Sequence, residues 1–173
     1  MYCKKVSLRD FRNINACSVE FCDGINILVG ENAQGKTNLL EALWLFNGSR
    51  SFRGSKDNEL IGFGRDFARL TIMFTSAQRE QTAEIIITGV KKIVTLNGVE
   101  KSSASEVSGS ICSVIFTPDH LSLVKEGPAE RRKFIDNAIV QIKPSYYSLL
   151  NRYNQTLSQR NALLKEINYK KEL

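Results

Sequence analysis

One eight-residue pattern constrains the fold of this chain more than any other feature. Residues 30–37 read GENAQGKT, which matches G-x-x-x-x-G-K-[ST]. In this pattern the glycines let backbone N–H groups approach phosphate oxygens, the lysine reaches the outer phosphates, and the threonine hydroxyl binds Mg²⁺. The helix that follows directs its positive N-terminal end at the same phosphates. The pattern therefore predicts a phosphate-binding loop for a nucleoside triphosphate.

The flanking residues predict the strand and the helix that such a loop needs. Residues 25–29 (INILV) are mostly apolar, which predicts a buried strand in the middle of a sheet. Residues 35–46 are followed by Asn-Gly, a helix stop signal, and predict a helix. Glu41 lies in that helix, and the pattern leaves open whether it faces solvent or supports the site. A glycine-rich structural turn is the alternative interpretation of the loop.

The other strands are predicted from alternating or β-branched residues. They are expected at residues 3–8, 19–21, 68–74, 83–88, 92–96, 99–101 and 112–116. Asn97 and Gly98 form a two-residue hairpin signal between two of them. Residues 49–66 are polar and rich in glycine, which predicts a loop with one helical turn.

Helices are predicted in the last third of the chain. One begins at Pro128 and ends at about residue 142, and another runs from Ser145 towards the end without a C-terminal capping signal. We therefore expect two units, a nucleotide-binding lobe at residues 1–124 and the beginning of a helical lobe at residues 125–173. The missing capping signal predicts that the chain stops within a longer helical element.

Charge is distributed unevenly between these two units. The net charge is +6, and residues 120–173 carry 10 basic and 5 acidic side chains. Such asymmetry favours a polyanionic partner near the C-terminal third, with a solvated helix face as the alternative. The four cysteines lack C-x-x-C spacing and there is one histidine, so we expect reduced, buried thiols rather than a zinc site. Without a long apolar run or a signal peptide, the sequence predicts a cytoplasmic protein outside the membrane.

The second half of a nucleotide-hydrolysing site is not found in the sequence. Hydrolysis in this class needs a carboxylate at the end of a second apolar strand. In VIFTPD, at residues 114–119, Thr117 and Pro118 separate the apolar residues from Asp119. Asp136 lies in a helical pattern instead. We therefore expect these residues alone to bind ATP weakly and not to turn it over.

Seven short motifs together resemble the RecF family. In chain order they are F-R-N at 11–13, G-E-N-A-Q-G-K-T-N-L-L-E-A at 30–42, S-F-R at 51–53, F-x-P-D at 116–119, G-P-x-E-R-R at 127–132, F-x-D at 134–136 and Q-R-N-x-L-L-K at 159–165. RecF resembles SMC-type ATPases. The resemblance implies an α/β P-loop NTPase of ABC-ATPase type, with a mixed sheet around the phosphate-loop helix and the start of a helical lobe. It also implies that this chain is the N-terminal part of a RecF sequence. The Walker B and signature motifs of the family would then lie later in that longer sequence.

The resemblance implies a set of nucleotide-binding residues. They are Gly30, Glu31, Asn32, Ala33, Gln34, Gly35, Lys36, Thr37 and Asn38 of the loop, with Arg12 and Asn13 after the first strand. Thr37 is implied to bind Mg²⁺, and a simple strand-end turn is the alternative for Arg12 and Asn13.

Two further segments match the family less closely. Residues 116–120 lie where SMC relatives carry a lobe-linking loop with a Gln that touches Mg²⁺; this sequence has no Gln there, and Asp119 or His120 is the substitute. Arg131 and Arg132, at a helix start, are expected either to tie the lobes together or to bind DNA.

The implied function is an ATP-dependent DNA-binding clamp of recombinational repair and replication. Such a clamp closes as an ATP-driven homodimer on gapped DNA and assists RecA loading, with RecO and RecR as partners. Arg152, Arg160 and Lys165 are the predicted DNA-binding residues. Two other classes stay open: another P-loop enzyme such as a small-molecule kinase, and a non-hydrolysing interaction module.

Overall fold

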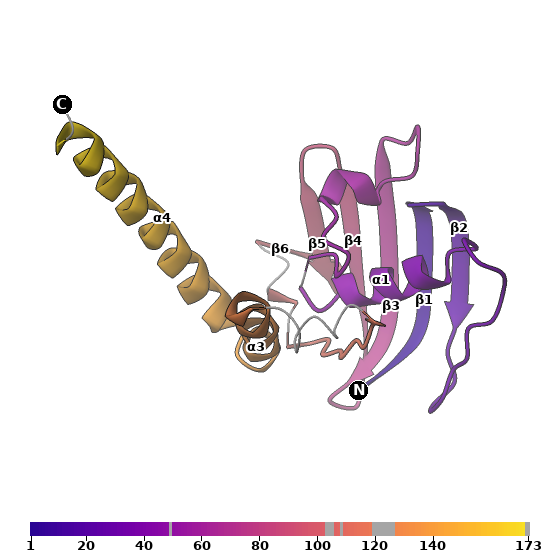
Figure 1. The fold of residues 1–173 in the computed structure, drawn as a ribbon. Coiled ribbons are helices and arrows are strands. Elements are labelled where there is room, and N and C mark those ends of the chain that lie inside the picture. The colour runs from indigo at the N-terminus through magenta and orange to yellow at the C-terminus, as the bar shows by residue number, and fades with distance from the viewer. Residues whose placement is uncertain (49, 103–105, 108, 119–126, 172–173) are drawn as a thin grey trace.

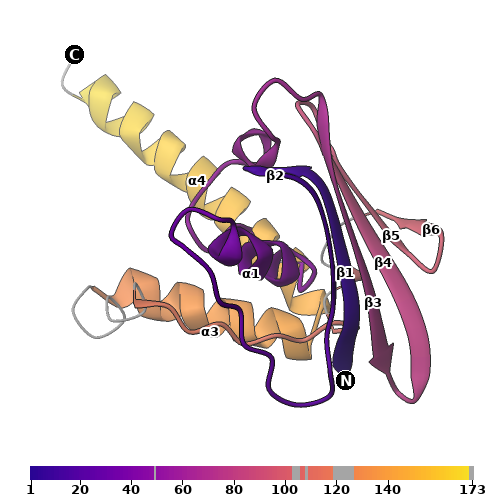
Figure 2. The ribbon, with the colours of Figure 1, turned by 90° about the vertical axis from the view of Figure 1, so that its right-hand side faces the viewer.

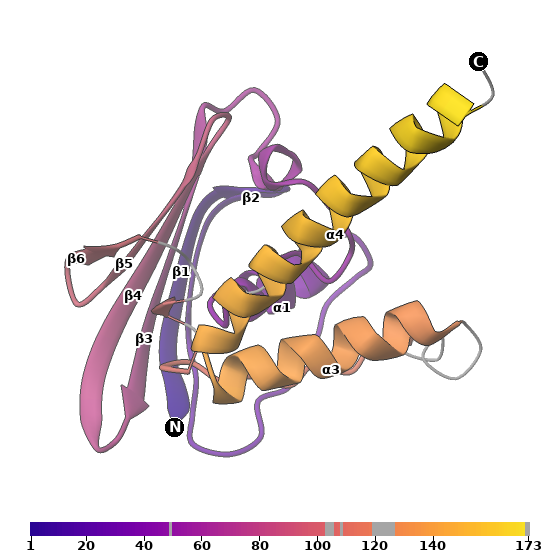
Figure 3. The same ribbon diagram turned by 90° about the vertical axis from the view of Figure 1, so that its left-hand side faces the viewer.

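The structure is a computed structural model that describes residues 1–48, 50–102, 106–107, 109–118 and 127–171. Its largest part is one curved sheet with a helix, α1 (Lys36–Leu45), lying across one face (Figure 1). Two further helices, α3 (Pro128–Ile142) and α4 (Ser145–Lys171), lie on the same side of the sheet as α1 (Figures 2 and 3). All three of these helices thus lie on one side of the sheet (Figures 2 and 3).

The sheet has six strands in the order β2-β1-β3-β4-β5-β6, and every neighbouring pair is antiparallel. The strands are β1 (Tyr2–Phe11), β2 (Ile14–Glu20), β3 (Phe67–Ser76), β4 (Arg79–Thr88), β5 (Lys92–Leu96) and β6 (Val99–Lys101). The strands predicted at 3–8, 68–74, 83–88, 92–96 and 99–101 are confirmed, whereas the strand predicted at 19–21 begins earlier, at Ile14, and ends at Glu20. Because β1 pairs with β3 directly, the whole segment between β2 and β3, including α1, leaves the sheet and returns across its face.

The core forms between this face of the sheet and α1. Burial alternates along β3, where Ala68, Leu70, Ile72 and Phe74 point inward, as expected for a strand with one covered face. The same alternation runs through the neighbouring strands and meets the apolar side of α1. The other inward residues of this cluster are Val6, Leu8, Phe11, Leu39, Ala42, Leu45, Phe46, Leu60, Ala83, Ile85, Ile87, Val94, Val107 and Ile111.

The predictions of two strands, one of them central in the sheet, are wrong. Residues 25–29 and 112–116 form no strand, and the side chains of Ile25 and Val29 are 87% and 84% exposed, while that of Phe116 is 84% exposed. A central strand needs a hydrogen-bonded neighbour on each side, and within the described ranges no segment pairs with either one. Their apolar composition is typical of buried strands, but no neighbouring strand covers either segment in the part of the chain that the structure describes. All strand pairing that the structure describes is antiparallel.

The predicted helices are confirmed. Besides α1, α3 and α4, the predicted helical turn in residues 49–66 is the short 3-10 helix η1 (Asp57–Leu60). Pro128 occupies the first turn of α3, and Tyr146 Oη at the start of α4 donates to Asp136 of α3 at 2.7 Å. The lobe boundary predicted at residues 124 and 125 lies outside the described residues, so the two-lobe division stays a prediction. No helix in the described part of the chain is long and apolar enough to cross a membrane.

The cysteines only partly match their prediction. All four are free, and Cys3 is half-buried, with burial raising the pKa of its thiol to about 11. Cys22 and Cys112 are exposed, so the prediction of buried thiols is wrong for these two. Cys22 lies three residues before 25–29, and Cys112 is the first residue of 112–116, so both are next to or within the segments that form no strand.

The hairpin between β5 and β6 provides a simple stability test. Asn97 and Gly98 both have positive φ, at 52° and 78°, as a two-residue hairpin requires. Gly98→Ala should lower the free energy of unfolding by about 1–2 kcal/mol, because a Cβ disfavours this conformation although the space around it is open. Gly89→Ala is the matched control: Gly89 also faces open space but lacks the left-handed φ. Urea denaturation measures the free energy of unfolding of both variants. Equal losses for Gly98→Ala and Gly89→Ala would contradict the hairpin geometry.

Candidate nucleotide-binding site

The loop before α1 has the backbone shape that its glycines predicted. Gly30, Ala33 and Gly35 have φ values of 149°, 65° and 91°, all in the positive range that favours glycine. A Cβ on Gly35 would also lie 3.1 Å from the Ile14 side chain and 3.4 Å from Asn13 Oδ1. Gly35 is therefore required twice, by its own backbone and by the close approach of the turn between β1 and β2.

Lys36 lies over the loop that precedes it. Its Nζ donates to the carbonyl oxygens of Gly30 at 2.7 Å and Glu31 at 2.5 Å. The first residue of α1 thus holds its ammonium against the beginning of the loop. Thr37, the next residue, is exposed. A cation and a helix N-terminus meet here, which is the arrangement that binds phosphate.

A cavity of about 680 Å³ opens beside the loop. Its lining contains eight of the predicted nucleotide-binding residues: Arg12, Asn13, Asn32, Ala33, Gly35, Lys36, Thr37 and Asn38. It also contains four residues that the sequence did not single out: Arg53, Glu59, Ile61 and Phe63. Three predicted residues, Gly30, Glu31 and Gln34, lie in the loop but do not line the cavity. Two segments far from the loop in sequence, the β1–β2 turn and residues 53–63, therefore complete the walls.

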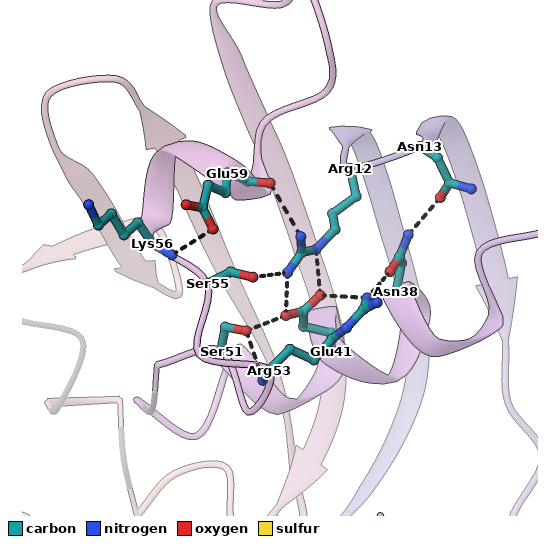
Figure 4. A network of polar contacts seen from close by, with 9 residues as sticks. All are labelled: Arg12, Asn13, Asn38, Glu41, Ser51, Arg53, Ser55, Lys56 and Glu59. Carbon is teal, nitrogen blue, oxygen red and sulfur yellow. Dashed lines mark hydrogen bonds and ion pairs between the residues drawn. The ribbon is translucent and has the colours of Figure 1, made fainter. Parts of the chain in front are cut away.

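The floor of this region is built around one buried carboxylate, that of Glu41 (Figure 4). Its side chain is 0% exposed and accepts two hydrogen bonds from Arg12, from Nε at 2.7 Å and from Nη2 at 2.8 Å. Ser51 Oγ donates to the same carboxylate. The question that the sequence left open is thereby answered: Glu41 faces inward, and its charge is paired, as burial of a carboxylate requires.

A second series of hydrogen bonds connects this floor to the loop. Asn13 Nδ2 donates to the carbonyl of Ala33 at 2.7 Å, and Asn38 Nδ2 donates to Asn13 Oδ1 at 2.7 Å. Arg53 Nη1 then donates to Asn38 Oδ1 at 2.8 Å. The turn after β1, the phosphate loop, α1 and residue 53 are therefore tied together by side chains, as Figure 4 shows for most of them.

The side chain of Arg12 is largely used in holding the protein together. Besides Glu41, its Nη2 donates to Ser55 Oγ at 2.6 Å and its Nη1 reaches the carbonyl of Glu59 at 3.5 Å. Its backbone has a φ of 53°, and its N–H donates to the Leu60 carbonyl at 2.9 Å. The alternative of a structural turn, left open for Arg12, thus gains support, while its guanidinium still borders the cavity.

The sequence contains signals for the site residues that were not predicted from it. Arg53 and Ser51 lie in the S-F-R motif, one of the seven motifs that carry the resemblance. Glu41 is the one charged residue in the otherwise apolar run at 39–46, and an acidic residue there needs a cationic partner if it is buried. Neither signal identifies the residues that pair with the Glu41 carboxylate, because Arg12 and Ser51 lie elsewhere in the sequence.

The other predicted site residues lie outside the cavity. Arg152, Arg160 and Lys165 are exposed on α4. At about 100° per residue, Arg160 lies about 80° around the helix from Arg152, and Lys165 a further 140° or so. The three do not share one face.

Of the remaining candidates for lobe contacts, only the two arginines lie within the described residues. Arg131 and Arg132 lie exposed in the first turns of α3. Asp119 and His120, the substitutes for the Gln of the lobe-linking loop, lie outside the described residues.

The AAA ATPase domain family matches residues 1–172. The chain belongs to the AAA ATPase domain family. It is 42% identical over 174 residues to DNA replication and repair protein RecF of Acetivibrio thermocellus, covering 100% of this chain and 47% of that relative, in its N-terminal part. RecF of Clostridioides difficile is 42% identical over 167 residues, covering 96% and 45%. This AAA ATPase domain chain thus spans about half the length of the curated relatives it matches, and the RecF resemblance is confirmed.

Solved structures agree with the family. A structure of the recombination mediator protein RecF with ATP, described in the RecFOR pathway, matches with a TM-score of 0.89 and 41% identity, over 96% of this chain and 45% of that one. Its RecF-ATPrS counterpart has a TM-score of 0.91 and 40% identity, with the same coverage. An SMC ATPase structure at 23% identity has a TM-score of 0.65, over 80% of this chain and 99% of the other, and shows the fold alone. The predicted fold class is confirmed by these matches.

Proposed function

We propose that this chain forms the ATP-binding part of a RecF-type protein that acts on DNA in recombinational repair and replication. The observation that carries the proposal is the cavity in which Gly35, Lys36 and Thr37 line one wall at the N-terminus of α1. The RecF names of the relatives support the DNA function, and the ATP named for the matched RecF structure supports the nucleotide. We propose a cytoplasmic location for such a protein.

The residues of the loop fit a Mg²⁺–triphosphate. Lys36 would exchange the carbonyl oxygens of Gly30 and Glu31 for outer phosphate oxygens, and residues 30–38 would surround the phosphates with backbone N–H groups. The exposed hydroxyl of Thr37 would hold Mg²⁺, which neutralises phosphate charge. In the described part of the chain no group of three His, Cys, Asp or Glu side chains could hold a metal. Phosphate oxygens and water are further ligands that Mg²⁺ commonly takes in such sites.

The far wall of the cavity suits the rest of the nucleotide. Arg53 adds a second cation, and its side chain is 44% exposed. Ile61 is half-buried, while Phe63 is fully exposed at the cavity edge. An exposed aromatic ring beside a phosphate site offers a face on which a nucleobase can stack. Arg12 holds this wall through the carbonyl oxygens of Glu59 and Leu60, and Asn13 holds the phosphate loop through the carbonyl oxygen of Ala33.

The assembly is proposed from the family. ATP would drive two such heads together on gapped DNA, where RecO and RecR would be partners in RecA loading. The matched SMC ATPase structure is described in terms of ATP-driven dimerisation, and the matched RecF structures in terms of the RecFOR pathway, which supports this choice. We propose residues 1–124 as the nucleotide-binding lobe and residues 125–173 as the beginning of the helical lobe.

Titration of ATP·Mg²⁺ into the chain, with and without duplex DNA, tests the proposal. We expect ATP to bind and to strengthen the binding of DNA. Calorimetry measures the affinity for the nucleotide, and fluorescence anisotropy measures the affinity for DNA. A small-molecule kinase would instead transfer phosphate to an acceptor, which mass spectrometry of a metabolite mixture would detect. DNA and partner binding that is unaffected by ATP would favour an interaction module.

The basic residues of α4 give a separate prediction about DNA. Replacing Arg152 and Arg160 together with alanine should weaken DNA binding uniformly across sequences and reduce the slope of log affinity against log salt by about 2. The two lie close around the helix, so they can reach one phosphate backbone. Lys165→Ala alone should reduce the slope by about 1. Arg79→Ala, at the exposed start of β4, is the control and should leave the slope unchanged; an equal effect there would contradict a DNA surface on α4.

A further inference from the structure

Two arginines at the edge of the cavity depend on the same carboxylate. Glu41 Oε2 lies 2.7 Å from Arg12 Nε and 3.8 Å from Arg53 Nη1, and Figure 4 shows the carboxylate between the two guanidinium groups. The Glu41 side chain is fully buried, whereas those of Arg12 and Arg53 are 18% and 44% exposed. One negative charge thus faces two positive charges at the border between the interior and the cavity.

The two arginines are held very differently. Arg12 has hydrogen bonds from all three of its nitrogens, to Glu41, Ser55 and the carbonyl of Glu59. The side chain of Arg53 has one short hydrogen bond, to Asn38 Oδ1 at 2.8 Å, and an ion pair with Glu41 at the longer distance of 3.8 Å. A guanidinium has five N–H donors. Arg53 therefore keeps donors for a ligand, while Arg12 is committed to the protein.

The carboxylate is itself fixed on the element that begins with Lys36. Glu41 belongs to α1, and Ser51 Oγ donates to it while also accepting from the backbone N–H of Arg53 at 3.1 Å. Any change in the position of the carboxylate is thus transmitted to Arg53 by two routes, through its charge and through Ser51. Because the Glu41 carboxylate is fully buried, its attraction to the two guanidinium groups is stronger than that between two groups at an open surface.

We propose that Glu41 is a positioning residue that holds the guanidinium of Arg53 at the cavity edge, ready to bind the terminal phosphate of a nucleoside triphosphate. This role rests on the proposed function. Arg53 exchanges part of its pairing with Glu41 for the phosphate, and Arg12 keeps the carboxylate neutralised when it does so. A diphosphate lacks the terminal group and gains less from the positioned arginine. Glu41 therefore contributes to the preference for ATP over ADP without touching either.

A double-mutant cycle tests this role, with ATP·Mg²⁺ and ADP·Mg²⁺ titrated separately into the chain. Glu41→Gln keeps the shape of the side chain but removes its charge, and Arg53→Gln removes the arginine. Each variant should weaken ATP binding about tenfold, the lower end of the effect of a hydrogen bond to a charged group, and ADP binding less than twofold. The double variant should bind ATP no more weakly than Arg53→Gln alone, because Glu41 acts through Arg53.

A milder variant protects the test against a folding failure of Glu41→Gln. Ser51→Ala keeps both charges and removes one hydrogen bond to the carboxylate, so it should weaken ATP binding about twofold, and only when Arg53 is present. Losses that add up in the double variant, or equal losses for ATP and ADP, would overturn the positioning role. The wild-type titration separates the two hypotheses. If the wild type does not bind ATP, the proposed function itself fails, whereas ATP binding with an additive cycle overturns only the role of Glu41.

Discussion

Replacing Lys36 with alanine is expected to weaken ATP binding at least about thirtyfold, the loss that follows when a charge paired with phosphate is truncated. The ammonium lies against the beginning of the loop, 2.7 Å from the carbonyl oxygen of Gly30. Isothermal titration calorimetry with ATP·Mg²⁺ measures the change. The fold should survive. The two carbonyl oxygens that lose the ammonium as a hydrogen-bond donor are in an exposed loop, where water can donate to them instead.

A control variant makes the result specific to the loop. Lys101→Ala removes a lysine from β6, which does not line the cavity, and it should leave ATP binding unchanged. Thermal unfolding should show both variants within a few degrees of the wild type. Unaltered ATP binding by Lys36→Ala would contradict the assignment of the loop, and unaltered DNA and partner binding would favour an interaction module.

The largest loss of stability is expected from Arg12→Ala. The change leaves the fully buried carboxylate of Glu41 without its main partner, and removing one member of a buried ion pair destabilises by about 3–5 kcal/mol. The turn between β1 and β2 also loses the bonds to Ser55 and Glu59 that hold it against residues 55–60. Urea denaturation followed by circular dichroism gives the free energy of unfolding.

Two comparisons decide whether burial is the cause. Arg9→Ala, three residues earlier on β1, removes an arginine that is 70% exposed and lies 3.6 Å from Asp10, so it should cost less than about 1 kcal/mol. Replacing Arg12 and Glu41 together with apolar side chains should recover much of the lost stability, because no unpaired charge is then left inside. A small effect of Arg12→Ala, similar to that of Arg9→Ala, would show that water reaches Glu41 in solution.

Much of the fold was predictable because it depends on neighbours in sequence. The hairpin at Asn97-Gly98 and the helix from Lys36 follow from local backbone preference, and the strands of the antiparallel sheet follow from apolar alternation. The segment at 25–29 shows the limit of this approach. Its composition is that of a central strand, yet a strand also needs partners, and composition cannot show whether partners are present.

The sequence by itself determined the phosphate-binding loop. Positive φ at Gly30 and Gly35, a lysine at the helix start and a helix dipole behind it are all local properties, so eight residues suffice to predict them. Only the tertiary structure decided what surrounds the loop. Arg12 and Glu41 are 29 residues apart, and any arginine can pair with any glutamate until the path of the chain brings two of them together. The antiparallel pairing of β1 with β3 lays α1 across the sheet beside the β1–β2 turn, and this proximity, rather than any motif, joins Glu41 to Arg12 and Arg53.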